Sequence, residues 1–417
     1  MRHFVTTTRL LAVLSAVALV LVACGNGDDA PDDAAPEPAT DETPDDAPDE
    51  DLEPIRIANV YEISGAGSSF GTKWGQGVQL AVEEINEAGG ILGREIELEE
   101  FDTQSEPPLS VTAVRRALEQ VEPFALFGSV FSSSTIVNME VAQEAGVPQF
   151  TGSESPAITQ QGNPYIFMSS YDSGTAFLKF GAFLDEIGAE NVAVVFQNDE
   201  FGQGASRAII PEIEARGLNL VEEITTEVGQ VDFAGEAARI INSGADAVIA
   251  VFSDEEAGRA HVGFGEAGVY DEIQMIGINP VVQSTALDLA GDAADGVQGI
   301  VDFSPAAPEL QPITDIYVER WGPGRPDHNF FKGYFSVYMM KIVLEQIGEL
   351  DQEAFINAIH DNTFCASDHP ELRGNSVHYA ENGRVDRDSF VVEVVDGQHN
   401  VLDVVGPLNP ENFEHCG

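Results

Sequence analysis

The stretch Phe124–Thr159, FALFGSVFSSSTIVNMEVAQEAGVPQFTGSESPAIT, contains two successive strand–loop units that decide the fold. The apolar run 124–127 predicts a short strand. A helix is expected to begin at the serine cluster 132–134 and to end at Gly146, because glycine commonly terminates helices. The next strand is predicted at residues 147–150. The pattern is typical of a parallel sheet in which a helix connects neighbouring strands.

A polar loop follows each of these two strands. The polar and small residues of the two loops are Ser132, Ser133, Ser134, Gly152, Ser153, Glu154 and Ser155. Open α/β sheets bind ligands in the crevice at the carboxyl ends of their strands, which makes both loops candidate ligand contacts. The N-terminus of a helix also favours a carboxylate, by roughly 0.3–1 kcal/mol at an exposed site. The alternative is that the serines only cap the helix.

The first 53 residues predict an export signal and a tether. The apolar run 10–23 follows two arginines and is short for a membrane span but typical of a secretory signal. Small residues before Cys24 resemble a bacterial lipoprotein signal, which would make residues 1–23 the signal peptide and Cys24 the lipidated residue. An ordinary signal peptide with an incidental cysteine is the alternative. Residues 24–53 are almost entirely Asp, Glu, Ala and Pro, which predicts a disordered acidic tether.

The composition limits the partners and cofactors. The chain has 71 Asp and Glu against 19 Lys and Arg, a formal net charge of −52. Such a surface argues against nucleic-acid and anionic-membrane partners. It suggests either a salty habitat, where screening reduces repulsion, or a solvated surface with no specific partner. The Gly/Ser-rich loop 62–71 lacks GxGxxG spacing and no metal-type spacing occurs, so no nucleotide, metal or other cofactor is expected.

The cysteine count predicts one disulfide. With Cys24 assigned to lipid, Cys365 and Cys416 remain, and two leftover cysteines in an exported protein usually pair. Closing a loop of about 50 residues would contribute roughly 4 kcal/mol in the chain-entropy model. The bond would tie down the C-terminus.

The remaining chain predicts two lobes of similar α/β architecture. Strand–helix alternation runs from residue 55 to 168 and again from 191 to 278, whereas 170–174 looks like a connector. Strands that alternate with helices of about a dozen residues indicate parallel sheets covered on both faces. From residue 280 the alternation is lost, although helices at 312–321, 330–348 and 352–360 and strands at 296–303, 389–395 and 399–404 are expected. This block would complete both lobes, and several crossings between lobes form a hinge.

Several motifs carry a family resemblance over about residues 55–405. They are Ile63-Ser64-Gly65 with Phe70-Gly71, the run 83–94 (EEINEAGGILGR), the serine loop 128–135, and Phe201-Gly202-Gln203-Gly204. With these motifs the chain resembles type I periplasmic binding proteins of the branched-chain amino-acid transport family. The resemblance implies two Rossmann-like lobes joined by three crossovers, with ligand between them. It implies residues 54–170 plus 281–372 as lobe one, 171–280 plus 373–405 as lobe two, and 406–417 as a C-terminal tail.

The resemblance also implies a ligand site. Ser132 matches a serine that holds the ligand carboxylate, and Gly152 and Glu154 match the loop that contacts the carboxylate and ammonium groups. Phe70 and Phe201 stand where tyrosines commonly close over the ligand, and Asn279 stands where amino-acid binders often have a glutamate. The full set of candidates is Ser132, Ser133, Gly152, Ser153, Glu154, Phe70, Phe201, Asn279, Trp74 and Tyr171. The aromatic residues could instead be core residues, and Tyr171 could pack in the hinge.

Two of these matches depart from the family pattern. An ionised Glu154 would repel a ligand carboxylate, and Asn279 cannot supply the charge that an ammonium requires. One hypothesis is that Glu154 replaces the missing acid and holds an ammonium, amidine or amide N–H. Another is that Glu154 points away and the ligand is a different carboxylate or an apolar molecule. A third possibility is that the match of the loop around Glu154 to the family pattern is shifted by one residue, in which case Glu154 would not depart from that pattern. Phenylalanines in the cleft would favour a partly hydrophobic ligand.

The function expected from these features is that of a lipid-tethered receptor of an ABC importer. It would bind a small polar or amphipathic solute, such as an amino acid or amide, close around it and deliver it to the permease subunits. The alternative is an extracytoplasmic sensor of the same fold. Catalysis is not expected, since no GxSxG elbow occurs around Ser132 or Ser153 and no histidine lies near them in sequence.

Overall fold

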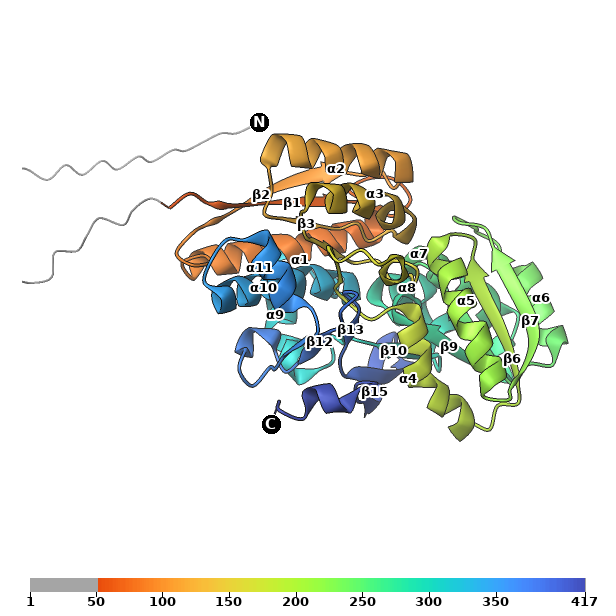
Figure 1. Ribbon diagram of the computed structural model, residues 1–417. Helices are drawn as coiled ribbons and strands as arrows, with labels where there is room; N and C mark the ends of the chain where they lie inside the picture. Colours follow the sequence, from red (N-terminus) through yellow and green to blue (C-terminus); the bar gives the residue numbers. More distant parts are fainter. Residues whose placement is uncertain (1–51, 417) are drawn as a thin grey trace, which may run out of the picture. The chain divides into compact units, whose positions relative to one another are not determined.

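The computed structural model describes residues 52–416, which contain two main sheets and one small sheet (Figure 1). The first main sheet is parallel throughout and has the order β2-β1-β3-β4-β5. Its strands are β1 (Ile55–Tyr61), β2 (Ile96–Asp102), β3 (Ala125–Phe127), β4 (Gln149–Thr151) and β5 (Ile166–Met168). We call this sheet, with its helices, lobe one.

Six helices accompany the first sheet. They are α1 (Ser68–Glu87), α2 (Pro107–Val121), α3 (Ser132–Ala145), α9 (Gln311–Trp321), α10 (His328–Ile347) and α11 (Gln352–Ile359). The main core of lobe one lies between the sheet and the helices α1 and α10, which pack directly on each other. Gly77 and Gly333 allow this close approach, because a Cβ at either position would clash with backbone of the opposite helix.

The second main sheet has the order β15-β14-β10-β9-β8-β6-β7 and defines lobe two. The strands β7, β6, β8, β9 and β10 are parallel to one another. Strand β14 is antiparallel to β10, and β15 is antiparallel to β14. The strands are β6 (Asn191–Gln197), β7 (Asn219–Thr226), β8 (Ala247–Val251), β9 (Gln274–Ile278), β10 (Gln298–Val301), β14 (Ser389–Val395) and β15 (Gln398–Val405). The helices are α4 (Ser173–Glu186), α5 (Glu200–Ala215), α6 (Ala234–Ser243), α7 (Asp254–Glu266) and α8 (Ser284–Ala290).

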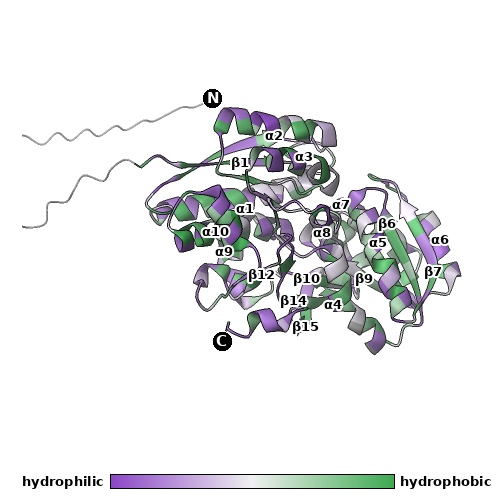
Figure 2. Cartoon of the chain, in the orientation of Figure 1, coloured by the Kyte–Doolittle hydropathy of each residue, from purple (hydrophilic) through white to green (hydrophobic). Residues whose placement is uncertain are grey.

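Hydropathy explains which strands are central. The central strand β6 is almost entirely hydrophobic, whereas its edge neighbour β7 mixes polar and apolar residues (Figure 2). Central strands of a parallel sheet are buried on both faces, so a continuous apolar run is expected there. Among the described residues, no helix has the length and apolarity needed to cross a membrane.

The chain passes between the lobes at residues 169–172, 302–307 and 387–388, and the C-terminal segment after β15 returns to lobe one in a fourth passage. Each of the first three crossings carries a buried polar side chain: Tyr171, Asp302 and Arg387, respectively. Burial raises the pKa of Asp302 to about 7, and the nearby Arg387 guanidinium opposes that shift. These crossings confirm the predicted α/β fold of two lobes joined by a three-stranded hinge.

The structure differs from the expected lobe boundaries in two segments. Strand β10 pairs with β9 and β14, so the chain returns to lobe one only after residue 301 and not at 281. The small antiparallel sheet of β11 (Asn362–Phe364), β12 (Val377–Tyr379) and β13 (Val385–Asp386) packs into the core of lobe one, although residues from 373 were expected in lobe two. Backbone pairing with distant strands decides both assignments, and local sequence does not reveal it.

The connector expected at 170–174 overlaps the crossing at 169–172, but the helix that follows it was not expected. Residues 173–186 form helix α4, which Asp172 caps by accepting a hydrogen bond from the Thr175 backbone N–H. Ala176, Phe177, Phe180 and Leu184 bury one face of this helix against the core of lobe two. The aspartate before an apolar run was the available signal.

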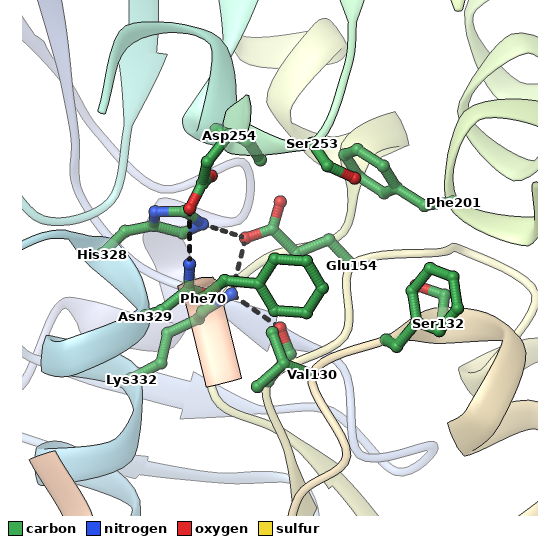
Figure 3. Close-up of a pocket in the computed structure, with 13 residues that line it drawn as sticks. Phe70, Val130, Ser132, Glu154, Phe201, Ser253, Asp254, His328, Asn329 and Lys332 are labelled. Carbon is green, nitrogen blue, oxygen red and sulfur yellow. Dashed lines mark hydrogen bonds and ion pairs between the residues drawn. The ribbon is translucent and has the colours of Figure 1, made fainter. Parts of the chain in front are cut away.

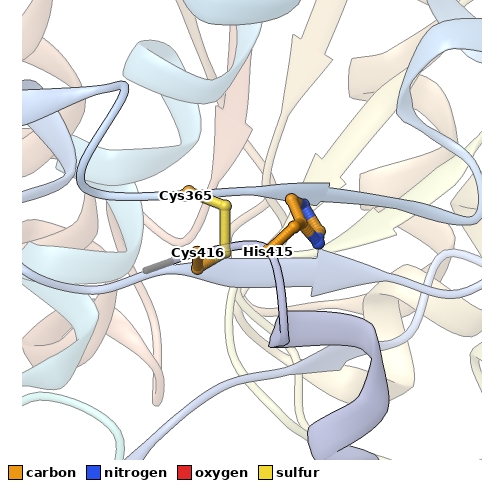
Figure 4. A group of neighbouring side chains, drawn as sticks. All are labelled: Cys365, His415 and Cys416. Atoms are coloured by element: carbon orange, nitrogen blue, oxygen red, sulfur yellow. A yellow bond between two sulfur atoms is a disulfide. The ribbon is translucent and has the colours of Figure 1, made fainter.

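Cys365 and Cys416 form a disulfide with a Cα–Cα distance of 5.1 Å (Figure 4). His415 lies beside the two sulfurs, so these three side chains have the proximity of a metal site. The sulfurs are bonded to each other and therefore offer no thiolate ligands, which argues against a metal ion in this oxidised form. The disulfide fastens the last described residue to the strand end of β11 in lobe one.

Candidate functional site

A pocket lies at the carboxyl ends of strands from both sheets. Its walls are the loops after β3, β4, β8 and β9 and the first turns of α1, α5 and α10. The lining residues are Phe70, Val130, Phe131, Ser132, Gly152, Glu154, Phe201, Ser253, Asp254, Pro280, His328, Asn329 and Lys332. The cavity has a volume of about 40 Å³, enough for a few water molecules. The cleft between the lobes is therefore narrow in this structure.

Glu154 forms a buried ion pair in the pocket wall (Figure 3). Its Oε1 accepts hydrogen bonds from Lys332 Nζ at 3.1 Å, Asn279 Nδ2 at 3.0 Å and Ser170 Oγ at 3.2 Å. Lys332 also donates to the Gly152 carbonyl oxygen at 2.6 Å. The Lys332 ammonium group is thus already paired within the protein. A buried ion pair is tolerated only with such additional hydrogen bonds. One hypothesis required Glu154 to point away from the pocket, but Glu154 lines it.

His328 lies on the other side of this carboxylate, with its Nε2 3.5 Å from Glu154 Oε1. Burial lowers the pKa of His328 well below its usual value, and the Lys332 charge lowers it further. The imidazole is therefore neutral at pH 7. Its Nδ1 is buried without a hydrogen-bond partner among the described residues, so it is a free polar atom in the pocket wall.

Asp254 is the other acid of the pocket. It is the first residue of α7 and is 1% exposed. Burial raises its pKa well above the usual value, and the neighbouring Asp327 carboxylate acts in the same direction. Its one hydrogen bond within the described chain comes from Asn329 Nδ2, at the long distance of 3.5 Å.

Helix α3 begins at the pocket without a side-chain cap. Phe131 occupies the N-cap position and no side-chain cap hydrogen bond forms, so the serines do not act as helix caps. The Ser132 hydroxyl lines the pocket and has no hydrogen bond to the described residues, whereas Ser133 Oγ accepts the Glu200 N–H at 3.4 Å. Ser132 is thus the serine available to a ligand.

A third acid, Glu62, lies behind the start of α3. Its Oε2 accepts the Val130 N–H at 3.0 Å, and it is fully buried. Burial raises the pKa of Glu62 to about 7, although backbone hydrogen bonds from Val130 and Phe131 oppose the shift. The Val130 amide is therefore already engaged and is not available to a ligand.

The structure brings five of the ten candidate residues to the pocket and leaves the other five outside its lining. Those at the pocket are Phe70, Ser132, Gly152, Glu154 and Phe201, and those outside are Ser133, Ser153, Asn279, Trp74 and Tyr171. Ser153 Oγ bonds to Thr135 and to carbonyl oxygens of the loop after β3. Asn279 orients Glu154 from behind. Trp74 is a core residue that donates to Asn59 Oδ1, and Tyr171 packs at the hinge in the core of lobe two.

Sequence reasoning missed the residues that α7 and α10 contribute. Asp254 follows the buried strand β8, and the rule that identified the loops of lobe one applies equally there. His328, Asn329 and Lys332 are polar residues in the first turns of an otherwise apolar helix. That polar cluster was a usable signal in the sequence. The contact of these residues with Glu154 could not be predicted, because Glu154 is far away in the sequence.

The lipidation candidate Cys24, with the predicted signal and tether, lies outside the described residues.

Comparison with known proteins identifies the family. The model of the family described as periplasmic binding protein matches residues 54–398. An amino acid binding protein of Pseudomonas aeruginosa is 30% identical over 294 residues, which cover 69% of this chain and 77% of the relative. The family is one of solute-binding proteins, not of enzymes, and periplasmic binding proteins are extracytoplasmic.

Solved structures show the same fold at low sequence identity. A leucine binding protein of Thermotoga maritima has a TM-score of 0.74 at 22% identity, covering 85% of this chain and 99% of that protein. A solute binding protein of an ABC transporter of R. palustris, in complex with benzoate, has a TM-score of 0.76 at 19% identity, covering 85% and 97%. The chain belongs to the periplasmic binding protein family, as a solute-binding protein of the branched-chain amino acid ABC transporter type.

Proposed function

We propose that this chain is the substrate-binding lipoprotein of an ABC importer. It captures a small amphipathic solute in the cleft between the lobes, closes around it and delivers it to the permease subunits. The observation that carries the proposal is the pocket, which takes side chains from the strand ends of both sheets. A ligand that touches both lobes favours the closed form by the difference between its affinities for the two forms.

The ligand contacts we propose are Phe70, Ser132, Gly152, Glu154 and Phe201. The phenylalanines supply apolar walls, and Ser132 supplies a hydroxyl without an internal partner. Lys332 and Asn279 hold Glu154 in place rather than meeting the ligand first. We propose no direct ligand contact for Ser133, Ser153, Trp74 or Tyr171, which lie outside the pocket lining.

A thermal-shift screen of the full chain against amino acids, amides, amines and organic acids tests ligand binding. A ligand at 100 times its Kd stabilises the folded state by about 2.7 kcal/mol. A hit should be confirmed by calorimetry and by the loss of its uptake in cells that lack the gene. Normal uptake together with a lost transcriptional response to the same ligand would instead identify a sensor.

We also propose that Cys24 carries the lipid that holds the protein at the membrane. Metabolic labelling with a fatty acid should label the wild-type protein but not the Cys24→Ser variant. The variant should leave the membrane fraction. Labelling of Cys24→Ser at the wild-type level would rule out this anchor.

A further inference from the structure

Asp254 is a buried acid in the ligand pocket, and no cationic side chain of the described residues pairs with it. Within residues 52–416, no Lys, Arg or His lies within ion-pairing distance of its carboxylate. Its carboxylate accepts a hydrogen bond from the Asn329 amide at 3.5 Å (Figure 3). The helix α7 that begins here offers partial positive charge, but this is worth far less than a counter-ion.

The other charged groups of the pocket do not supply the missing charge. Lys332 is engaged by Glu154 and by the Gly152 carbonyl, and His328 is neutral because it is buried. Asp327, on the loop before α10, adds a further buried carboxylate near Asp254. The pocket therefore contains more buried carboxyl groups than cations near Asp254. Burial favours the protonated form of Asp254 while no cation is present, and a cation that enters would favour the ionised carboxylate.

The side of the pocket toward lobe one disfavours an anion. Glu62 takes the Val130 N–H just before α3 begins, so this amide is not available to a ligand carboxylate. A ligand carboxylate beside Glu62 would repel its ionised form, which burial already disfavours.

The walls of the pocket suit an organic cation. Phe70, Phe131 and Phe201 line the same space, and the rings of Phe70 and Phe131 lie 6.3 Å apart with a tilt of 40°. The faces of aromatic rings attract ammonium groups, most strongly where water is excluded. The same rings also bury the apolar part of a ligand.

We propose that the cleft binds a small organic cation, an ammonium group on an apolar body, with Asp254 as its counter-ion. The inference rests on the proposed function as a solute receptor and narrows the class of solute. Asp254 belongs to lobe two and the phenylalanines Phe70 and Phe131 to lobe one, so the cation links the two lobes. Glu62 disfavours ligands that present only a carboxylate.

The test compares three molecules with one branched carbon skeleton: 3-methylbutylamine, leucine and 4-methylpentanoate. Binding to the full-length chain is measured by calorimetry at low ionic strength, with benzyltrimethylammonium and benzoate as an aromatic pair. We expect the amine to bind more tightly than leucine, and the two carboxylates to bind at least tenfold more weakly than the matching cations. Tighter binding of leucine or of either carboxylate would overturn the inference and leave the receptor function standing.

Two variants assign the charges. Asp254→Asn should weaken 3-methylbutylamine binding at least tenfold, whereas Glu255→Gln, the adjacent and more exposed acid of the same helix, should change it less than twofold. Glu62→Gln should narrow the gap between leucine and the amine. Unchanged amine binding by Asp254→Asn would reject Asp254 as the counter-ion.

The stability of the unliganded variant is an independent readout. Because Asp254 has no internal counter-ion, Asp254→Asn should unfold at the same or a higher temperature than the wild type. A lower Tm, or a variant that does not fold, would show a structural partner for Asp254 and would overturn the inference. If none of the five molecules bound to the wild type, the receptor function for small amphipathic solutes would be rejected together with it.

Discussion

Lys332 on helix α10 donates to Glu154 in the loop after β4 across 3.1 Å, and both side chains are almost fully buried. The pair joins two segments of lobe one that are 178 residues apart in sequence. Its position in the ligand pocket means that it shapes the cleft as well as the core.

Breaking this pair from one side should be strongly destabilising. Lys332→Met leaves the Glu154 charge buried without its cation, which costs about 3–5 kcal/mol of folding stability. The double variant Lys332→Met with Glu154→Gln should recover a large part of that loss, because the remaining group is neutral. Urea unfolding of both single variants and the double variant measures the coupling.

The control for this cycle lies on the same helix. Lys341 pairs with Glu345, four residues away and near the surface, at 2.6 Å. Lys341→Met should therefore change stability by less than about 1 kcal/mol. Equal effects of the substitutions at Lys332 and Lys341 would contradict the view that burial makes the first pair important.

Ser132→Ala should separate binding from stability. Because the hydroxyl neither caps α3 nor bonds to another described residue, its loss should alter the urea midpoint very little. Ligand affinity should fall about fivefold, which corresponds to one hydrogen bond of about 1 kcal/mol. Calorimetry with a ligand from the screen checks the affinity, and a large loss of stability with unchanged affinity would favour a structural role.

Stability should fall as the pH rises from 6.5 to 8. Burial raises the pKa of Glu62 and of Asp302 to about 7, so both acids keep a proton in the folded protein at pH values where the unfolded chain has lost it. The folded state then binds more protons, and its stability is lost as the pH rises through about 7, by roughly 1 kcal/mol for each acid. Urea midpoints between pH 6.5 and 8.5 measure the slope.

Two histidines act in the opposite direction at lower pH. Burial lowers the pKa of His261 and of His399 to about 4, so between pH 4 and 6.5 the unfolded chain binds more protons. Alone, the histidines would make stability rise over that range, but Glu62 and Asp302 lower it between about pH 4 and 7. The two effects nearly cancel, so we expect a plateau below about pH 6 and a decline above it. Glu62→Gln should flatten the decline above pH 6.5, whereas Glu140→Gln, an exposed acid on α3, should leave it unchanged.

Reduction of the disulfide should lower stability without opening the pocket. The bond closes a loop with a sequence separation of 51, for which the chain-entropy model gives about 4 kcal/mol. The Cys365→Ser, Cys416→Ser double variant should lose a comparable amount in urea unfolding, yet bind ligand with an affinity close to that of the wild type. A wild type whose stability does not respond to a reducing agent would argue against the bond in solution.

The fold was predictable mainly where burial leaves a strong pattern. The runs 192–196 of β6 and 247–251 of β8 are apolar, and a strand buried on both faces requires such a run. Helix α4 was missed because its apolar residues follow a short polar stretch that also fits a connector. The return of the chain between lobes depends on the pairing of β10 with β14, which lie far apart in sequence.

The site was predictable on one side. The loops after β3 and β4 were recognisable from their polar residues, and Ser132 and Glu154 do line the pocket. The hydrogen-bond partners of Glu154 were not recognisable from the sequence, because tertiary packing brings Lys332 and Asn279 to it. The acid expected to meet a ligand cation therefore changes from Glu154, which is internally paired, to Asp254.

Both ends of the described chain belong to the same lobe. The chain enters through β1 at Ile55, and its last residues are fastened to lobe one through Cys416. Any attachment at either terminus therefore holds lobe one, and lobe two reaches that attachment through the three hinge crossings and the segment that follows β15. If the protein is anchored at either terminus, lobe one is held in place and lobe two moves when the cleft closes. Ligand capture then need not displace lobe one.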